Sequence, residues 1–351
     1  MRIRPALPAF AFAFAFAFLC LAATAATAAT ATTAGAADWP HQRGPSQNGH
    51  LPEGAPAPET LPDDPRVVWK IPAADGFAAP IISGGRVIYG ELENGKEVFR
   101  AVSFADGKRL WSDVLDDPHK DGFGTGPRCA PVSDGAIALI QSCKGALHCL
   151  DAATGELRWK ANYLTDFGAP YVGEKGTTEG SARHGYASSP LIDGDHVIAL
   201  AGGPGAAVVC FDKASGKVAW RSQDDQAAYA PPQIAVIGGV RQVVCFTVGG
   251  LIGLDRAGGR LLWRVPLATK FGRHVAAPVI RGDLVIAGSH EIGLVAARVT
   301  KAGGGFQAEE AWRLGSDRGP NFASPIAIGD HLYTLAGNEV ACLDLRTGEQ
   351  A

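Results

Sequence analysis

The stretch Cys149-Leu150-Asp151-Ala152-Ala153-Thr154-Gly155, followed four residues later by Trp159, is the part of the sequence that decides the predicted fold. A second copy, Cys210-Phe211-Asp212-Lys213-Ala214-Ser215-Gly216, leads to Trp220 with the same spacing. An Asp side chain accepts hydrogen bonds from backbone N–H groups two or three residues further on, and Gly takes the left-handed conformation that such a turn needs. The Trp then begins the next strand, where its large apolar face fills the gap between neighbouring sheets.

Weaker copies of this closing turn occur elsewhere in the chain. Asp106-Gly107 precedes Trp111, and Asp255 with Gly259 precedes Trp263, again with four residues from Gly to Trp. A further copy, Asp344 to Gly348, has no Trp after it. We therefore assign a structural role in the repeat to Trp69, Trp111, Trp159, Trp220, Trp263, Trp312, Asp151, Gly155, Asp212, Gly216, Asp255, Gly259, Asp344 and Gly348.

A small residue followed by Pro opens each unit, at Ala79-Pro80, Ala130-Pro131, Ser189-Pro190, Ala230-Pro231, Ala277-Pro278 and Ser324-Pro325. Glycine- and aspartate-rich hairpin turns and short apolar runs follow in the units, and these runs are too short for helices. Six units of about 40 to 50 residues, each with four short strands, predict an all-β protein with the β-propeller fold. A β-sandwich is the alternative, but it gives no reason for a closing turn that recurs at this period.

The composition agrees with a folded β protein that does not bind nucleic acid. The chain has 351 residues, with 32 Lys and Arg against 35 Asp and Glu, so its formal net charge is −3 and no basic excess is available for phosphates. Hydrophobic residues make up 46% of the chain, which excludes wholesale disorder.

Residues 1–37 have the pattern of a secretory signal peptide. Arg2 and Arg4 precede an apolar run, residues 9–22, and small residues then continue to Ala37. A membrane anchor is the alternative, but the apolar run is shorter than the ~20 residues that a span needs, and Phe18-Leu19 before Cys20 does not suit lipidation. We expect a periplasmic or secreted protein with a signal peptide (1–37), an N-terminal extended segment (38–66) and the propeller (67–351).

The repeated unit resembles that of PQQ-like (quinoprotein-type) β-propellers, which include quinoprotein dehydrogenases and the BamB outer-membrane assembly family. Residues 38–45, Asp-Trp-Pro-His-Gln-Arg-Gly-Pro, resemble the "DWPQFRGP" start of an exported bacterial group of these proteins. The resemblance covers nearly all of 38–351. It implies seven or eight units where six are visible, which leaves two interpretations. Either the strand around Trp69 completes the sixth blade, or the chain is a fragment truncated at its C-terminus, which we slightly favour.

The resemblance also implies what a quinone enzyme would contain. PQQ alcohol dehydrogenases of this superfamily hold Ca²⁺ with carboxylate and amide oxygens, use an Asp base and often carry a vicinal Cys-Cys pair. This sequence has no such pair, so we expect no catalytic, cofactor-binding or metal-binding residue, with PQQ and Ca²⁺ as the alternative. Cys149, Cys210 and Cys342 hold equivalent places in different units and are expected to be free. For Cys129 and Cys143, a disulfide within one unit stays open.

One set of polar residues has a position in common that suggests binding. These residues lie just before the Ala/Ser-Pro pairs, where the chain returns to the innermost strand at one mouth of the central channel: Arg128, His184, Tyr186, Tyr229, Arg273, His274, Arg318 and Asn321. Together they predict a funnel for an anionic or planar ligand, or for a peptide. The alternative is that they only satisfy the loop backbone and solvate the mouth.

These observations predict a non-catalytic, exported β-propeller that acts as a binding or scaffolding module in the cell envelope. We expect envelope proteins or peptides as partners, no nucleic acid, no membrane span once the signal is removed, and a monomer. A PQQ- or metal-dependent periplasmic oxidoreductase is the alternative function.

Overall fold

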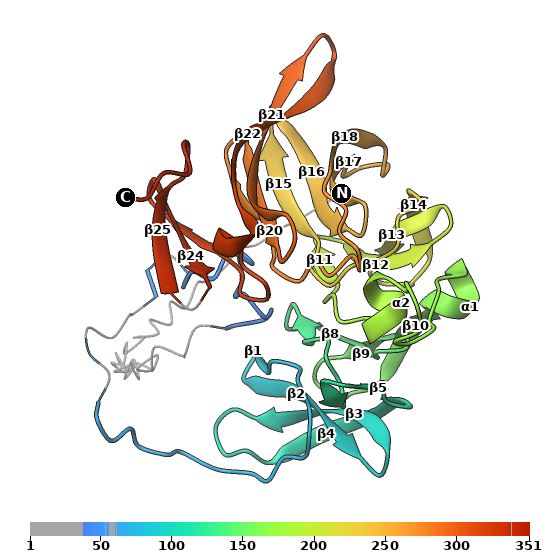
Figure 1. The fold of residues 1–351 in the computed structure, drawn as a ribbon. Coiled ribbons are helices and arrows are strands. Elements are labelled where there is room, and N and C mark those ends of the chain that lie inside the picture. The colour runs from blue at the N-terminus through green and yellow to red at the C-terminus, as the bar shows by residue number, and fades with distance from the viewer. Residues whose placement is uncertain (1–37, 53, 56–59, 61, 338) are drawn as a thin grey trace, which may run out of the picture. The chain divides into compact units, whose positions relative to one another are not determined.

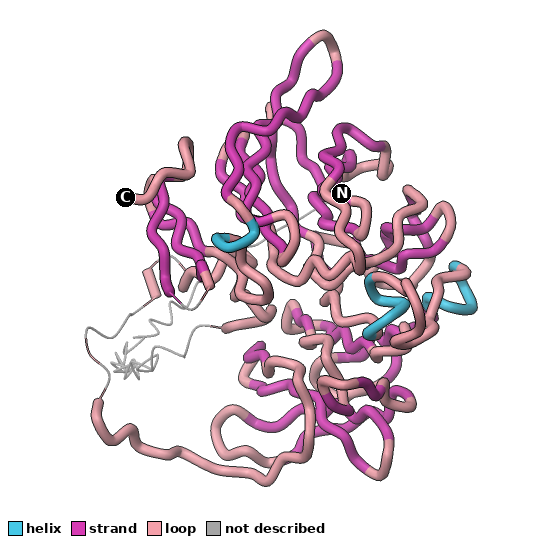
Figure 2. Tube along the Cα trace, viewed as in Figure 1, coloured by secondary structure: helices cyan, strands magenta, loops and turns pink. Residues whose placement is uncertain are grey.

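The computed structural model describes residues 38–351 except 53, 56–59, 61 and 338. The predicted signal peptide lies outside the described residues. Strands and the turns between them account for nearly all of the described chain (Figure 2). Among the described residues, no helix is both long enough and apolar enough to cross a membrane.

The strands form six successive antiparallel sheets, which we call blades 1 to 6 in chain order (Figure 1). Blade 1 contains β1 (Ile81–Ser83), β2 (Arg86–Glu93), β3 (Lys96–Ser103) and β4 (Arg109–Asp116). Blade 2 contains β7 (Val132–Ser133), β8 (Ile137–Gln141), β9 (Ala146–Asp151) and β10 (Leu157–Asn162). Blade 3 contains β11 (Leu191–Asp193), β12 (His196–Gly203), β13 (Ala206–Asp212) and β14 (Val218–Ser222).

The remaining blades follow the same order. Blade 4 contains β15 (Gln233–Ile237), β16 (Val240–Thr247), β17 (Gly250–Asp255) and β18 (Leu261–Pro266). Blade 5 contains β19 (Val279–Arg281), β20 (Leu284–Ser289), β21 (Gly293–Ala302) and β22 (Gly305–Leu314). Blade 6 has three described strands, β23 (Ile326–Ile328), β24 (His331–Ala336) and β25 (Glu339–Asp344). Both the β-propeller prediction and the count of six repeat units are therefore confirmed.

The sequence predicts insertions at 112–128, 161–187 and 297–311, which lengthen particular connections of the repeat. These insertions carry the other elements. Insertion 112–128 holds the hairpin of β5 (Lys120–Asp121) and β6 (Gly124–Thr125), and insertion 161–187 holds α1 (Tyr163–Phe167) and α2 (Gly180–His184). Insertion 297–311 lengthens the hairpin of β21 and β22. A single 3-10 turn, η1 (Ser316–Arg318), follows β22.

Local sequence explains the hairpin that joins the first two strands of blade 1. Ser83 pairs with Arg86 across Gly84 and Gly85, whose φ angles are 56° and 74°. A two-residue turn with two positive φ angles matches the right-handed twist of the strands, and Gly adopts it without steric strain.

The closing turns lock each blade to its neighbour through the predicted tryptophans. The Asp151 carboxylate accepts hydrogen bonds from the N–H groups of Ala153 (2.9 Å) and Thr154 (3.0 Å), and Gly155 has φ 76°. The indole of Trp111, from the outer strand of blade 1, lies on Gly155 so closely that a Cβ there would be 2.6 Å from its Cγ. The indole nitrogen also donates to the Ala152 carbonyl (3.0 Å). Gly is therefore required for its φ angle and for the space beneath the indole.

The same contact recurs from blade to blade. Trp159 lies on Gly216, Trp220 on Gly259 and Trp312 on Gly348. In each case the indole N–H donates to the carbonyl three residues before that Gly, namely those of Lys213 (2.7 Å), Arg256 (3.2 Å) and Leu345 (3.0 Å).

Trp69 bears the same relation to blade 1 as Trp111 bears to blade 2. Its indole packs on Gly107 and donates to the Phe104 carbonyl, three residues before that Gly (2.8 Å). Ser103, whose carbonyl accepts the Gly107 N–H (2.8 Å), therefore takes the place that Asp151 has in blade 2. Asp106, one residue before the glycine, corresponds to Thr154 and not to Asp151. The interpretation of Asp106 as the aspartate of a closing turn is therefore wrong.

In the described residues, the segment around Trp69 pairs with no strand of blade 6. Val67 and Val68 beside Trp69 are 74% and 67% exposed and belong to no described strand. On β25, Leu343 forms a bridge with Gln350, just as Leu150 pairs with Leu157 in blade 2. The residues that directly follow the closing turn of blade 6 therefore occupy the position where the outer strand of this blade begins.

Trp263 does not pack on the closing-turn glycine of the next blade, because blade 5 has no closing turn. The lengthened β21–β22 hairpin replaces that turn, and the Trp263 indole instead donates to the Gln242 side chain of its own blade (2.6 Å). The motif before Trp263, Asp255 to Gly259, does not predict that the indole bonds within its own blade.

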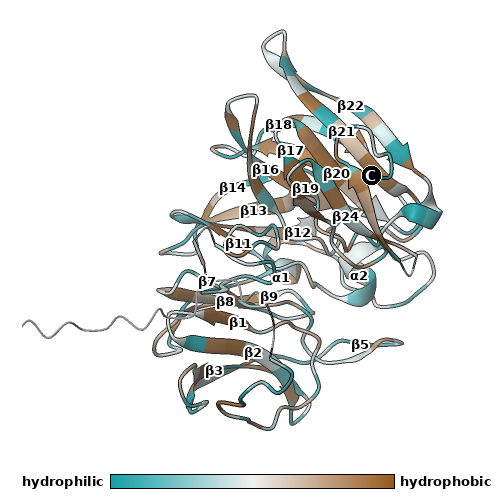
Figure 3. Cartoon of the chain, turned by 90° about the vertical axis from the view of Figure 1, so that its left-hand side faces the viewer, coloured by the Kyte–Doolittle hydropathy of each residue, from teal (hydrophilic) through white to brown (hydrophobic). Residues whose placement is uncertain are grey.

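Apolar clusters between adjacent blades form the core, and Figure 3 shows the strands as its most hydrophobic parts. One cluster joins Ile88 and Phe99 of blade 1 to Ile140 and Leu150 of blade 2. Further clusters join blades 2 to 4, blades 4 and 5, and blades 5 and 6. The innermost strands also touch, since β7 lies against both β1 and β11 and β19 lies against β23.

The N-terminal segment 38–50 lies across the end of these innermost strands. Trp39 exchanges both backbone hydrogen bonds with Ile82 of blade 1 (2.8 and 3.0 Å). At the other end of the segment, Arg43 Nη2 donates to the Pro325 carbonyl (2.9 Å) and His50 Nε2 lies 2.8 Å from the Ala327 carbonyl of blade 6. One short segment therefore links the first blade to the last described one.

The Trp–Gly contact predicts different effects for two alanine substitutions. Gly194→Ala, at φ 60° with no atom within 4 Å of the new Cβ, should lower the free energy of unfolding by about 1 kcal/mol through backbone strain alone. Gly216→Ala, at φ 70° with Trp159 atoms 2.7 Å from the new Cβ, should lower it by about 2 kcal/mol more, because the indole must move. Thermal unfolding of both variants measures the difference. Equal melting temperatures would show that the indole does not lock the blades.

Candidate functional site

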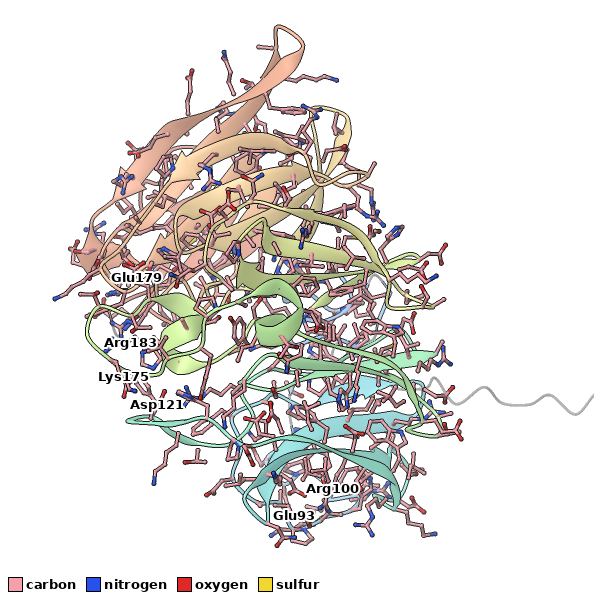
Figure 4. The ribbon with its side chains drawn as sticks, turned by 90° about the vertical axis from the view of Figure 1, so that its right-hand side faces the viewer. Glu93, Arg100, Asp121, Lys175, Glu179 and Arg183 are labelled. Carbon is pink, nitrogen blue, oxygen red and sulfur yellow. The ribbon has the colours of Figure 1, made fainter. Side chains whose placement is uncertain are left out.

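Two insertions meet near the mouth where the innermost strands of blades 2 and 3 begin. The β5–β6 hairpin brings Asp121 and α2 brings Arg183 and His184 to this place; Figure 4 labels Asp121 and Arg183. The turn after Asp121 is local, since the Asp121 carboxylate accepts the Phe123 N–H (2.8 Å).

Asp121 is the centre of a buried charged cluster. Its side chain has no exposed surface, and both carboxylate oxygens accept from the Arg128 guanidinium at 2.7 Å. One of them, Oδ2, also accepts from His184 Nδ1 (2.9 Å) and His119 Nε2 (3.0 Å). Arg128 in turn donates to the His184 carbonyl (2.9 Å). Every strong acceptor position of this carboxylate is therefore occupied.

The charges around Asp121 determine its ionisation. Burial alone would raise the pKa of Asp121, but hydrogen bonds from Arg128, His184, the Phe123 N–H and His119 outweigh it and hold the pKa well below its usual range. Burial lowers the pKa of His119 despite the neighbouring carboxylate, so this ring is neutral near pH 7. Its other nitrogen, Nδ1, lies 2.7 Å from the Tyr171 hydroxyl.

The cluster extends to blade 4 through Arg183. Arg183 Nε donates to His184 Nε2 (3.1 Å), and its guanidinium lies 4.4 Å from the centre of the Phe271 ring. The Lys270 ammonium lies 5.1 Å from the same ring. On the blade 1 side, Phe77 lies 5.6 Å from the Arg128 guanidinium, and Phe123 packs edge to face on His184. We call Phe77, Phe123 and Phe271, with Arg183 and Lys270, the aromatic rim.

The predicted funnel residues are distributed between this cluster and the interior. Arg128 and His184 belong to the Asp121 cluster. Tyr186 is 1% exposed and donates to the Pro170 carbonyl (2.9 Å), while the buried Tyr229 donates to the Gly180 carbonyl. His274 is 0% exposed and stacks on Phe246 at 4.0 Å between ring centres.

The remaining predicted residues lie nearer blades 5 and 6. Arg273 is partly buried and its carbonyl accepts from Ser289 (3.1 Å), and Arg318 and Asn321 line hollows beside η1. The tyrosines and His274 lie too deep to contact a ligand at the mouth, because they fill space between blades. The funnel as a ligand site stays a prediction.

No pattern in the sequence indicated that Asp121, His119 and Arg183 belong to one cluster. They lie within the predicted insertions 112–128 and 161–187, which is the signal that pointed to the region. Asp121 and His184 are 63 positions apart in the sequence, so no short sequence motif predicts that they pair.

The cluster contains the types of side chain that bind transition metals, but the other contacts of these side chains disfavour metal binding. His119, Asp121 and His184 place donor atoms within 4.8 Å of one another, as in sites of two His and one carboxylate. However, the Arg128 charge lies directly on the Asp121 oxygens. Arg183 donates to His184 Nε2, which places the proton on the nitrogen, Nδ1, that a metal would need. The residues fit a salt-bridged structural centre better than a metal site.

A Ca²⁺–quinone centre fits this mouth no better. Ca²⁺ takes about six to eight oxygen ligands, whereas the buried carboxylate here lies among arginine and histidine nitrogens. The described cysteines, Cys129, Cys143, Cys149, Cys210, Cys245 and Cys342, are all free. Cys129 and Cys143 are therefore unpaired in this structure.

A second buried carboxyl lies close to the cluster. Glu97 on β3 has no exposed surface, and its Oε2 accepts the Cys143 N–H (3.0 Å) while Oε1 has no hydrogen-bond partner. Burial, with a smaller contribution from the Asp116 charge, raises the pKa of Glu97 to about 7. Glu97 therefore changes its charge near neutral pH.

Comparisons with known proteins identify what the chain is similar to. The family model described as "Outer membrane protein assembly factor BamB" matches residues 96–351. The structure is similar to that of BamB from Moraxella catarrhalis, with a TM-score of 0.55 and 17% identity over 78% of this chain and 74% of that chain. It is also similar to a europium-containing methanol dehydrogenase, with a TM-score of 0.55 and 13% identity over 78% of this chain and 67% of that chain.

At these identities the two solved structures show a common fold alone. The search of curated proteins found no match.

Asp121→Asn should destabilise the protein strongly, because it leaves the Arg128 charge buried without its partner. We expect a loss of about 3–5 kcal/mol in the free energy of unfolding. Asp117→Asn, which removes an exposed pair with Lys96, is the control and should leave the free energy of unfolding nearly unchanged. Since the folded-state pKa of Asp121 is depressed, its stabilisation is present above its ordinary pKa of 3.8 and is lost as the pH falls below that value. Wild type should therefore lose more stability than Asp121→Asn at low pH; parallel pH profiles would contradict this.

Glu97→Gln should change the pH dependence of stability in the opposite direction. The folded-state pKa of about 7 lies above the ordinary value of 4.5, so wild type loses stability as the pH rises from 4.5 through 7. Gln keeps the acceptor for the Cys143 N–H and has no charge to desolvate. Unfolding at pH 5 and pH 8 should give a gain for the variant of about 3 kcal/mol at the higher pH. If the free energies of unfolding of the two proteins differ by the same amount at pH 5 and at pH 8, the raised pKa of Glu97 is wrong.

Proposed function

Since the chain belongs to the PQQ-like β-propeller repeat family, we propose that it is a non-catalytic binding or scaffolding module of the cell envelope. The BamB-like fold supports a propeller that binds or assembles proteins there. The proposal includes export through the sequence pattern of residues 1–37 and envelope proteins or peptides as partners.

The observation that carries the proposal is the aromatic rim above the Asp121 cluster. Phe77 and Phe123 are 54% and 59% exposed, although each has its other face against the cluster. Aromatic residues, Phe included, and Arg are enriched in protein interfaces, where they bury a large area. The rim is therefore suited to hold a protein or peptide segment.

The Asp121 cluster supports binding rather than chemistry. A general base needs a free lone pair within reach of its substrate, and the Asp121 oxygens are engaged with Arg128 and two histidines. The same contacts fix the β5–β6 hairpin, which carries Phe123, to α2. Phe77 and Phe271 lie against the Arg128 and Arg183 guanidinium groups, so the three rings rest on a rigid base. Preorganised side chains lose less entropy when a partner binds.

The second candidate function is a PQQ- or metal-dependent oxidoreductase of the periplasm. The similar fold of the europium-containing methanol dehydrogenase favours it, and the poor fit of the mouth to Ca²⁺ or a transition metal disfavours it. We propose that no quinone or metal is required.

The rim proposal predicts the outcome of photo-crosslinking and affinity measurements. A photoreactive phenylalanine at position 123 should crosslink to an envelope partner in living cells, whereas the same residue at the equally exposed Val236 should not. Phe77→Ala with Phe123→Ala should then raise the Kd for the purified partner by about tenfold or more. Val114→Ala with Val236→Ala, which removes similarly exposed apolar side chains, should leave the Kd unchanged.

Two results would contradict the proposal. Equal Kd values for the two double variants, with unchanged melting temperatures, would exclude the rim as the binding surface. A stoichiometric quinone spectrum with substrate turnover, after addition of PQQ and Ca²⁺ to the purified protein, would overturn the non-catalytic function.

A further inference from the structure

A cavity of about 360 Å³ lies between the N-terminal segment and the innermost strands of blades 3 to 6, and none of the residues of the aromatic rim lines it. Its lining runs along the whole of β11 and β19, from Leu191 to Asp193 and from Val279 to Arg281. Residues of β15 and Ala327 of β23 also line it, so four blades converge on this space. Its volume is in the range of small-molecule sites.

The N-terminal segment 43–50 forms the cover of the cavity and is held from several sides. Besides its contacts with Pro325 and Ala327, it receives a hydrogen bond from Gln233 of blade 4 to the Gln47 carbonyl (3.3 Å). Arg43 holds the segment itself, since it donates to the Gln47 carbonyl (3.1 Å) and the Asn48 carbonyl (3.2 Å). The segment that lines one side of the cavity is therefore fixed by contacts with blades 4 and 6.

The charges that line the cavity are mainly positive. Arg43, Arg241 and Arg281 contribute three guanidinium groups, against the single carboxylate of Asp193. Arg241 and Arg256 each bind one oxygen of that carboxylate, so it is already neutralised. The chain as a whole carries a formal charge of −3, so this positive lining is a local feature and not a general property of the surface.

Two of the arginines have no acidic partner among the described residues. Arg43 bonds only to neutral carbonyls, and burial lowers its pKa from the usual value, which reflects a charge that has lost part of its hydration. Arg281 forms no ion pair in the described part of the chain. A partly desolvated guanidinium without a carboxylate is stabilised by any anion that enters the space.

Gln47 provides a further, independent indication of a ligand. Its backbone has φ 55°, in the left-handed region that side chains other than Gly rarely adopt, and such strain gathers at functional sites. Its amide oxygen is buried without a hydrogen-bond partner, and a buried acceptor without a donor is unfavourable. Both features cost free energy at a residue that lines the cavity.

We propose that this cavity binds a small organic anion that carries two or more carboxylate groups. The carboxylates contact Arg281 and Arg43. The site lies away from the aromatic rim, so the proposal does not depend on the proposed function.

Calorimetric titration with citrate tests the proposal on the purified protein. Wild type should bind one citrate, and Arg281→Ala should raise the Kd by about tenfold or more. Arg260→Ala removes an exposed arginine that does not line the cavity and is the matched control; it should leave the Kd unchanged. Because Arg281 lies at the exposed end of a strand, its variant should keep the melting temperature of wild type.

Two further probes test the class of ligand. Acetate, which has a single carboxylate, should bind more weakly, and binding as tight as that of citrate would overturn the role of two arginines. Inorganic phosphate should also bind more weakly than citrate, and tighter phosphate binding would overturn the assignment to carboxylates. Absence of citrate binding, or an equal loss in Arg281→Ala and Arg260→Ala, would overturn the site itself.

Discussion

The contact between the tryptophan of one blade and the closing-turn glycine of the next is the constraint on which the rest of the structure depends. A propeller blade is a small twisted sheet that cannot bury both faces by itself, so the geometry of its contact with the next blade determines its position. The indole of Trp111 on Gly155 combines a large apolar contact with a hydrogen bond to a defined carbonyl. Repetition of this contact at Trp69, Trp159, Trp220 and Trp312 gives successive blades the same relation.

Because the blades are fixed in this way, insertions in their connections can be long without disturbing the core. The β5–β6 hairpin and α2 contribute little to the apolar clusters, yet they meet at the Asp121 cluster and are held there by buried charges. Breaking a buried ion pair is far more costly than breaking an exposed one, so this cluster determines the conformation of both loops. The exposed aromatic residues above it thereby acquire fixed positions, which a solvated loop would not give them.

The connections between blades and the cavity between the innermost strands differ in chemistry for a structural reason. The long connections carry aromatic and paired charged residues. The cavity lies against the N-terminal segment, which supplies Arg43 and Gln47 to its lining. The connections are suited to a large partner that contacts exposed rings, whereas the cavity is a space for a small charged molecule. The same scaffold therefore presents two surfaces with separate requirements.

The sequence by itself determined the repeat, the propeller fold and the place of the insertions, because these depend on interactions within a few residues of each other. Asp151 bonds the N–H groups two and three residues on, Gly155 ends the turn, and Trp159 follows at a fixed distance. Only the tertiary structure decided that Trp263 bonds within its own blade, that Tyr186 and His274 are buried, and that Asp121 pairs with His184. Those outcomes depend on which side chains the folded blades bring together across tens of residues. The local pattern of a repeat is the same whether or not the neighbouring blade supplies the partner.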